Sequence, residues 1–352
     1  MNHRGRVRYL LASSSTGEGY RSFLPALVHG LKKVYVLKGA PGLGKTAFIR
    51  QVGLDLAAKG YQADFFVSPA SNSLLEGVIC FPLEFAVVDG DLGYPRASQE
   101  IDISGEIIEL DELCDREILA EREPETRELV EEIRKQWQTA SELLAAAGRL
   151  KEEMNRLWDE ESDLDGIDRL VEALAAEILE RKPCERHYFG SALSAQGLVS
   201  YVDHLSLACK ARYILEGPVD RVKSAVLLEV GRRALAKGYE VEFFHDGFYP
   251  ENLNMIIVTS LGVAVIDAGG LSLTARPGDI ILDAREWVGT KPEKVFLPVV
   301  AEKRCRLNEL IDEAARSLLE AETSLKRFHK IYSQAMDFGK MELIKERVMQ
   351  EI

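Results

Sequence analysis

The stretch KGAPGLGKTAFIRQVGLDLAAKGYQADFF, residues 38–66, has a second version later in the same chain. The second version is EGPVDRVKSAVLLEVGRRALAKGYEVEFF, residues 216–244. The two stretches share a lysine, the tripeptide KGY and the pair FF, all at the spacing that separates Lys45 from Lys223, here called the repeat offset. Self-similarity at a fixed offset is typical of an internal duplication, so the fold is expected to occur twice.

The repeat extends well beyond these stretches. Residues 34–89 and 212–267 share 19 identities in 56 ungapped positions, more than chance produces. The match begins earlier still, where RYLLASSSTGEG resembles RHYFGSALSAQG if one residue of slippage is allowed. Because domains usually have about 100–200 residues, we expect two tandem domains, residues 1–182 and 183–352.

Each copy has the same order of predicted elements. An apolar strand leads through a loop into a helix, and Gly60 or Gly238 stands where the glycine after a helix belongs. A second strand and two further apolar, β-rich runs follow, and the last run ends in an acid, Asp89 or Asp267. Strand–helix–strand alternation predicts the α/β class: two tandem three-layer α/β domains, each with a mainly parallel sheet.

A long helical stretch closes each copy. Apolar residues recur at three-and-four spacing over about residues 125–181 and 301–352. Each stretch contains a break, at Gly166 in the first and Gly339 in the second, so we expect an antiparallel helical hairpin appended to each domain. Two interpretations stay open: a cap that packs on its own sheet, or an arm that binds a protein partner.

The loop of the first copy carries the motif that predicts chemistry. It fits G-x-x-x-x-G-K-[ST] in full and lies directly between a strand and a helix, the context that a phosphate-binding loop requires. Glycines let backbone N–H groups converge on phosphates, the helix N-terminus adds partial positive charge, and the lysine reaches the β- and γ-phosphates. The predicted nucleotide-binding residues are Gly39, Ala40, Pro41, Gly42, Leu43, Gly44, Lys45 and Thr46.

A phosphate loop works with an acid at the end of an apolar strand, which helps to hold Mg²⁺. The run FAVVD supplies Asp89, so Thr46 and Asp89 are the predicted magnesium ligands. Many ATPases with such a loop place a glutamate directly after that acid, but here Gly90 and Asp91 follow. Asp91 is either the catalytic base or a turn residue, because Asp-Gly is a strong turn signal. The predicted catalytic residues are Lys45, Asp89 and Asp91.

The second copy keeps the frame of the loop but not its glycines. Lys223 remains, but Asp220 stands at the position of the middle glycine and Val222 at that of the last. A carboxylate repels phosphate, and a β-branched side chain lacks the φ freedom of glycine. We therefore expect a single functional site, in the first half. Whether Arg221 or Lys223 reaches across to that site stays open.

Composition bounds the remaining choices. The 352 residues carry a net charge of −13, which disfavours a large nucleic-acid surface. Five scattered cysteines without a CxxC pair are typical of a reducing compartment and argue against a structural zinc site. The first residues contain only a short apolar stretch, and no run is long enough to span a membrane. We therefore expect a cytoplasmic protein with no membrane contact.

With both copies in view, the chain resembles a poorly characterised bacterial family of tandem, duplicated P-loop ATPase-like proteins. The resemblance covers nearly the whole chain: the RYLLASSSTGEG and RHYFGSALSAQG leaders, the two KGY–FF blocks, and the strand ends at Asp89 and Asp267. It implies P-loop NTPase-like domains, nucleotide binding and ATPase activity with ATP and Mg²⁺. The chain departs from the family in its degenerate second loop and in GDLGY after Asp89, where a threonine-containing turn is expected.

Three functions fit these residues. The first is a Mg-ATP-dependent ATPase with a single site in the first half. The second is a non-hydrolysing, ATP-dependent switch or binding module, favoured by the lack of a glutamate after Asp89. The third, a small-molecule or nucleotide kinase, ranks lower, because such kinases use paired arginines and the region after Asp89 offers mainly acids and the isolated Arg96. ATP is expected rather than GTP, since no N/T-K-x-D guanine-recognition motif is evident.

Overall fold

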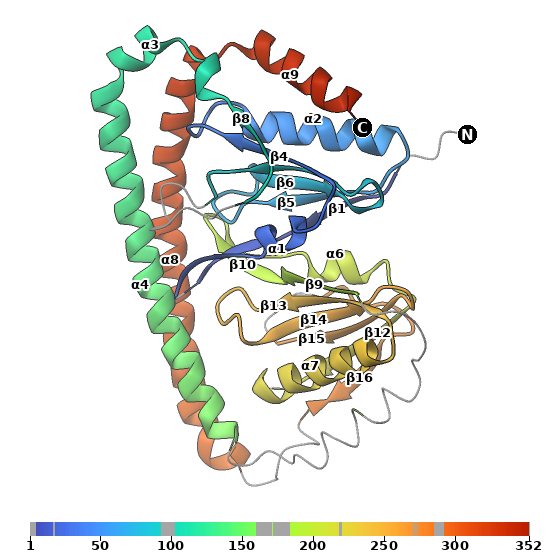
Figure 1. Cartoon of the computed structure of the whole chain (residues 1–352). Coiled ribbons are helices and arrows are strands. Elements are labelled where there is room, and N and C mark those ends of the chain that lie inside the picture. Colours follow the sequence, from blue (N-terminus) through green and yellow to red (C-terminus); the bar gives the residue numbers. More distant parts are fainter. Residues whose placement is uncertain are drawn as a thin grey trace.

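In a computed structural model, the chain forms two α/β halves that lie beside a pair of long helices (Figure 1). The domain boundary expected at residues 182 and 183 lies outside the described residues, and so does the break expected at Gly166. Side chains are not described at residues 157–159 and 292–298. The structure describes residues 5–16, 18–92, 103–159, 171, 184–217, 220–269, 271, 273–284 and 292–351.

The first half contains a six-stranded sheet made of β1 (Val7–Leu10), β4 (Lys33–Lys38), β5 (Ala63–Val67), β6 (Leu75–Cys80), β7 (Phe85–Asp89) and β8 (Glu106–Glu109). The strands lie in the order β1-β5-β6-β7-β4-β8. Of these six strands, five run in one direction and β6 runs against both of its neighbours. The expected mainly parallel sheet is therefore confirmed.

The second half repeats this sheet with β9 (Cys184–Phe189), β12 (Ala211–Glu216), β13 (Glu240–His245), β14 (Leu253–Val258), β15 (Val263–Asp267) and β16 (Ile280–Asp283). Their order is β9-β13-β14-β15-β12-β16, the same as in the first half, strand for strand. The single antiparallel strand, β14, is also the counterpart of β6. Two halves of one topology confirm the duplication.

The repeat offset also holds at the beginning of each half. Val7 pairs with Ala63 in the first sheet, and Glu185 pairs with Val241 in the second. Both residues of the second pair lie one repeat offset after those of the first, so the one-residue slippage expected between the leader segments is wrong. A short hairpin follows in each half, made of β2 (Ser13–Thr16) and β3 (Gly19–Ser22), or of β10 (Ser191–Ser194) and β11 (Gly197–Ser200).

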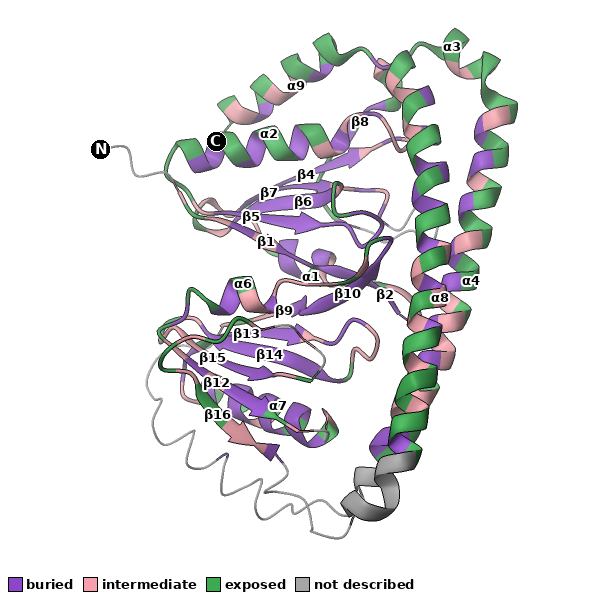
Figure 2. Cartoon of the chain, turned by 180° about the vertical axis from the view of Figure 1, so that it is seen from behind, coloured by how far each residue is buried: buried purple, intermediate pink, exposed green. Residues whose placement is uncertain are grey.

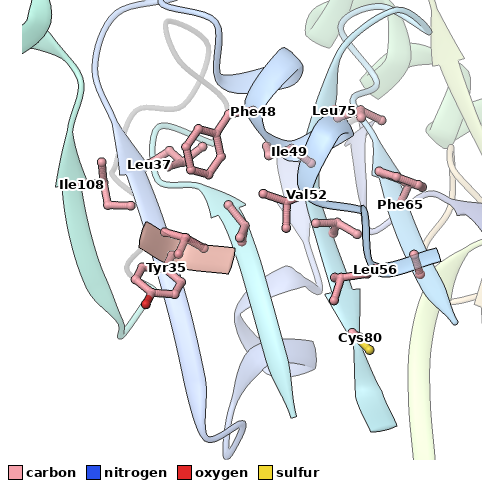
Figure 3. Packing of buried hydrophobic residues seen from close by; sticks show 14 of the residues in the cluster. Tyr35, Leu37, Phe48, Ile49, Val52, Leu56, Phe65, Leu75, Cys80 and Ile108 are labelled. Atoms are coloured by element: carbon pink, nitrogen blue, oxygen red, sulfur yellow. The ribbon is translucent and has the colours of Figure 1, made fainter. Parts of the chain in front are cut away.

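One helix covers the outer face of each sheet, α2 (Lys45–Ala58) in the first half and α7 (Asp220–Ala236) in the second (Figure 1). Apolar side chains of α2 pack among those of the strands (Figure 3). Gly53 brings α2 close to the sheet, since a Cβ there would lie 2.2 Å from the ring of Phe65. Gly231 stands in the same relation to a phenylalanine ring of the second sheet, at 2.3 Å. The glycine repeated in both helices therefore serves packing.

The inner faces of the two sheets share one hydrophobic core. Two short helices, α1 (Leu24–Val28) and α6 (Val202–Ser206), lie between the sheets (Figure 1). Side chains from both sheets and from these two helices form one continuous cluster, so the halves pack face to face. Buried members of this cluster from the two halves include Leu10, Val36, Phe66, Val88, Tyr188, Phe244, Met255 and Ile266.

The two long helices pack against each other across the halves. This corrects the hairpin expected in the second half, whereas the second arm of the hairpin expected in the first half lies outside the described residues, apart from residue 171. α4 (Glu123–Asp159) follows the first sheet and α8 (Pro292–Ala335) follows the second, and they run side by side past both halves (Figure 1). Their apolar stripes meet in a common cluster. The periodicity of each helix was sufficient to predict the stripe but not its partner. The facing residues are Ile133, Trp137, Ala140, Leu144, Ala314, Leu318, Ala321 and Leu325.

The break in the second helical stretch falls at Met336 and Asp337, before the expected Gly339. Asp337 caps α9 (Phe338–Gln350) by accepting a hydrogen bond from the Lys340 amide. α9 does not fold back on α8: it lies over α2, and its apolar residues join the core of the first half (Figure 1). The shorter helical segments are η1 (Phe81–Leu83), η2 (Asp111–Leu113) and α3 (Arg116–Glu121).

The long helices are amphipathic. Figure 2 shows buried residues along the sides of α4 and α8 that face each other and exposed residues elsewhere. Among the helices that the structure describes, none is both long and apolar enough to cross a membrane.

Candidate functional site

The predicted phosphate loop, residues 39–44 and here called the glycine loop, joins β4 to α2. Its three glycines have positive φ angles: 135° at Gly39, 103° at Gly42 and 81° at Gly44. Residues other than glycine rarely adopt such angles, so the path of the backbone requires each glycine of the motif. Gly44 is the N-cap of α2, directly before its first residue, so the loop lies at a helix N-terminus.

Lys45 lies buried beneath the loop. Its Nζ is 2.7 Å from Asp89 Oδ1 and 2.7 Å from Asp91 Oδ2, and it donates a hydrogen bond to the Gly39 carbonyl at 2.7 Å. Burial alone would lower the pKa of Lys45, but the two carboxylates outweigh it and hold the pKa above its ordinary value. The structure thus brings together the three residues predicted to be catalytic.

Asp91 lies in the turn after β7, and its carboxylate binds the loop. Its Oδ2 accepts hydrogen bonds from the Gly39 amide at 2.8 Å and from Lys45 at 2.7 Å. Its own amide donates to Asp89 Oδ1 at 2.9 Å. Both acids at the end of β7 therefore hold the glycine loop and its lysine in place.

The hydroxyl of Thr46 fixes the start of α2 to the sheet. Thr46 Oγ accepts a hydrogen bond from the Leu75 amide at 3.1 Å, and Ser224 accepts one from the Leu253 amide at 2.9 Å. Both residues of the second bond lie one repeat offset later, so the contact belongs to the duplicated fold. A hydroxyl oxygen has two lone pairs, and this bond uses one of them. The other lone pair is left for a further partner, and Mg²⁺ at Thr46 stays a prediction.

Asp89 and Thr46 are the donors that fit a magnesium ion here. Among the described residues, no group of three or more His, Cys, Asp or Glu side chains could hold a metal by itself. Mg²⁺ usually keeps several waters and binds through one or two carboxylates and the phosphates of a substrate. The hydroxyl and carboxylate at this loop match that incomplete set of protein ligands.

A cavity of about 640 Å³ opens beside the loop, and the second half supplies part of its wall. Helix α8 contributes a polar and basic face that the sequence alone did not connect with the loop. These residues recur at three-and-four spacing, which is typical of any solvated helix face and gave no functional signal. The α8 residues that line the cavity are Leu325, Lys326, His329, Lys330 and Ser333.

Gly42 lies close against the backbone of α8. A Cβ at Gly42 would lie 2.7 Å from the carbonyl oxygen of His329 and 2.8 Å from its Cα. Burial, and then the charge of Lys45, lowers the pKa of His329 to about 4. His329 is therefore neutral at pH 7, so its imidazole brings hydrogen-bonding capacity to the cavity without charge.

The degenerate loop of the second half has become helix. α7 begins at Asp220, whereas α2 begins at Lys45, the counterpart of Lys223. Lys223 is fully buried, 2.5 Å from Asp267 Oδ1 and 3.3 Å from Asp220 Oδ1. Burial, together with the nearby Asp220, raises the pKa of Asp267 to about 6 despite the lysine. Lys223 thus belongs to an ion cluster within its own half.

Each long helix reaches the loop of the other half. Lys151 of α4 pairs with Asp246 of the second half at 2.7 Å, and Arg221 lies 3.5 Å from Glu152 of α4. Lys151 and His329 are separated by the repeat offset, so they occupy the same position on the two helices. Lys151 and Glu152 of α4 thus contact the second half, whereas the two carboxylates that pair with Lys223 belong to its own half.

A further carboxylate, Glu76 of β6, lines the cavity. It is 3% exposed, and its Oε1 accepts hydrogen bonds from the Tyr20 hydroxyl at 2.8 Å and from the Ser68 hydroxyl at 3.0 Å. The sequence signal for it lies in the duplication: its counterpart, one repeat offset later, is Asn254, so only the first copy has an acid there.

Comparison with known proteins gives no further guide to this site. No protein-family model, curated protein or solved structure matches the chain. Its function is therefore inferred from the residues and their geometry.

Proposed function

We propose that the first half is a P-loop NTPase-like domain that binds Mg·ATP at the glycine loop and hydrolyses it. The observation that carries the proposal is the arrangement around one cavity: three glycines with positive φ, a buried lysine and a strand-end acid. Chance glycine-rich turns do not combine these features with a helix N-terminus. The matching second-half loop is helical, so we propose one site per chain.

In this proposal each residue has a separate task. The backbone N–H groups of the glycine loop surround the phosphates, and Lys45 contacts the β- and γ-phosphates. To do so, the Lys45 ammonium exchanges its present contact with Asp91 for phosphate oxygens. Thr46 and Asp89 hold Mg²⁺, which neutralises charge that develops on the phosphates.

The α8 face adds positive charge from the other half. Lys326 and Lys330 of α8 line the same cavity as Lys45. Charged donors aimed at a transferring phosphoryl group stabilise its transition state, and they are strongest where water is excluded. We therefore place these lysines near the terminal phosphate of the nucleotide.

A second candidate function is a non-hydrolysing, ATP-dependent switch. The contact between Gly42 and the backbone of His329 favours it, because any shift of the loop moves against α8. α8 packs along α4, which reaches the second half, so a shift at the loop has a path to both halves. This candidate differs from the first in one respect: it predicts tight binding without turnover.

Turnover and binding of ATP by the purified chain, with Mg²⁺, test both candidates. We expect hydrolysis that is lost in Lys45→Ala and kept in Lys59→Ala, which removes an exposed lysine at the other end of α2. GTP should be a poorer substrate. Binding that depends on Lys45 without turnover supports the switch, and no nucleotide binding by the unaltered chain contradicts both.

A further inference from the structure

Glu76 and Asp89 lie opposite each other on neighbouring strands. β6 and β7 are antiparallel, and Gly77 pairs with Val88 at the end of their ladder. One position further, the same register sets Glu76 against Asp89. Opposite residues of an antiparallel pair point to the same face of the sheet, with Cβ atoms about 5 Å apart. Both carboxylates also line the cavity beside the glycine loop, so they face one site.

The carboxylate of Glu76 is held in a fixed orientation. Its Oε1 accepts hydrogen bonds from the hydroxyls of Tyr20, at 2.8 Å, and Ser68, at 3.0 Å. The three residues come from the first hairpin, the loop after β5 and the start of β6, so distant parts of the half meet here. A buried acid supported by donors from separate elements is positioned for a specific task.

Of the carboxylates that line the cavity, two are already engaged with the loop. Asp91 Oδ2 holds the Gly39 amide and Lys45, and Asp89 Oδ1 holds Lys45 and the Asp91 amide. Glu76 Oε1 accepts hydrogen bonds from the hydroxyls of Tyr20 and Ser68, which belong to neither the glycine loop nor Lys45. Asp89 is also the predicted magnesium ligand, which leaves Glu76 as the acid suited to accept a proton.

The second half has lost this acid together with its loop. Asn254 is the counterpart of Glu76, and the register of β14 and β15 sets it against Asp267, as Glu76 is set against Asp89. An amide cannot accept a proton from water. The supporting Tyr20 is also replaced there, by Leu198. The half without a glycine loop is thus also the half without this carboxylate.

We propose that Glu76 is the general base of the first-half site, an inference that rests on the proposed ATP hydrolysis. Its carboxylate takes a proton from a water molecule as the water oxygen forms a bond to the γ-phosphorus. The bond between that phosphorus and the β,γ-bridging oxygen breaks, and ADP leaves with the electron pair. Glu76 then gives up the proton to solvent as inorganic phosphate is released. No other reactant is needed.

The test compares ATP turnover and ATP binding by the full chain and by Glu76→Gln. Gln keeps the shape and the acceptor oxygen for Tyr20 and Ser68 but cannot act as a base. General-base catalysis contributes about 10²- to 10⁴-fold, so turnover should fall by that factor. Affinity for ATP and for Mg²⁺ should change by less than about threefold, well under 1 kcal/mol. Nucleotide recovered from the variant should be intact ATP.

Further variants and outcomes separate the alternatives. Glu76→Asp should recover part of the turnover, and Glu84→Gln, an acid between β6 and β7 outside the cavity, should behave like the unaltered chain. Turnover by Glu76→Gln within threefold of normal overturns the assignment, as does loss of Mg²⁺-dependent binding, which makes Glu76 a metal ligand. ATP binding without turnover by the unaltered chain overturns it too but leaves nucleotide binding intact. If Glu76→Gln does not fold, Tyr20→Phe takes its place, and we expect a smaller reduction in ATP turnover from it.

Discussion

The two halves share one topology but differ in the segment around the shared lysine. In the first, three glycines hold a loop open, and Lys45 lies beneath it at the edge of a cavity. In the second, the chain is helical from Asp220 onward, and Lys223 is sealed in a cluster with Asp220 and Asp267. The lysine, the hydroxyl after it and the strand-end acid are common to both. What separates a proposed binding site from a core ion cluster is therefore the backbone that the glycines allow.

The largest expected effect on ATP affinity comes from copying the second loop into the first. In Gly42→Asp, a residue with a Cβ must adopt a positive φ, and its side chain also clashes with the backbone of His329. Strain and overpacking of this kind cost the observed loop conformation about 3 kcal/mol together. The loop should therefore leave this conformation, and if ATP binding has to restore it, affinity falls roughly 100-fold. A titration with a fluorescent ATP analogue measures it. The matched reverse change, Asp220→Gly, should create no second site, and ATP binding by that variant in the second half would break the comparison.

The largest expected effect on stability comes from the loss of a buried partner in the second half. Lys223→Met leaves Asp267 buried without its lysine, and removal of one partner of a buried pair costs about 3–5 kcal/mol. Chemical denaturation should show this loss of stability with ATP affinity unchanged. The double variant Lys223→Met/Asp267→Leu should regain most of it. A Lys223→Met protein as stable as the unaltered chain would show that the cluster is not a core element.

A smaller effect is expected from the helix that crosses to the second half. Lys151→Ala removes the ion pair to Asp246, whose carboxylate keeps hydrogen bonds from the Phe248 and Tyr249 amides. We expect a loss of about 2–3 kcal/mol in the free energy of unfolding. Lys326→Ala, at an exposed position of α8, should cost less than about 1 kcal/mol. Equal losses in thermal or chemical unfolding would contradict the buried role of Lys151.

A further expected effect is a pH dependence of stability. The pKa of His329 is lowered to about 4 in the folded protein, below its ordinary value of 6.5. The folded state therefore binds fewer protons than the unfolded state between these values, and stability falls as pH drops from about 6.5 to 4. One such group contributes at most about 1.4 kcal/mol per pH unit. His329→Gln should flatten this slope, and an unchanged slope in denaturation at several pH values would place the effect elsewhere.

Much of the fold could be predicted from the sequence. The repeat, the strand–helix–strand order and the glycine loop are local patterns, and the structure keeps all three. The pairing of α4 with α8 could not be predicted. An apolar stripe indicates that one face of a helix is buried, but it does not identify the element that packs against that face. For the same reason, the sequence did not predict that Lys326, His329 and Lys330 line the cavity. Their spacing is that of a solvated helix face, and only the position of α8 beside the loop shows their role in the cavity wall.

Glu76 shows a different kind of limit. Within LLEGVIC it is one acid in an apolar strand, and nothing local sets it against Asp89. The comparison of the copies, in which Glu76 becomes Asn254, carried a signal that only the strand register made meaningful. Asp91 was predicted as either base or turn residue, and the structure shows it in the turn, bonded to Gly39 and Lys45.

The number of ATP molecules bound per chain tests the central claim most directly. Isothermal titration of the full chain with Mg·ATP should give one site, which disappears in Lys45→Ala. A count of two, or a single site that survives the loss of Lys45, would contradict the proposed division between a binding half and a closed half.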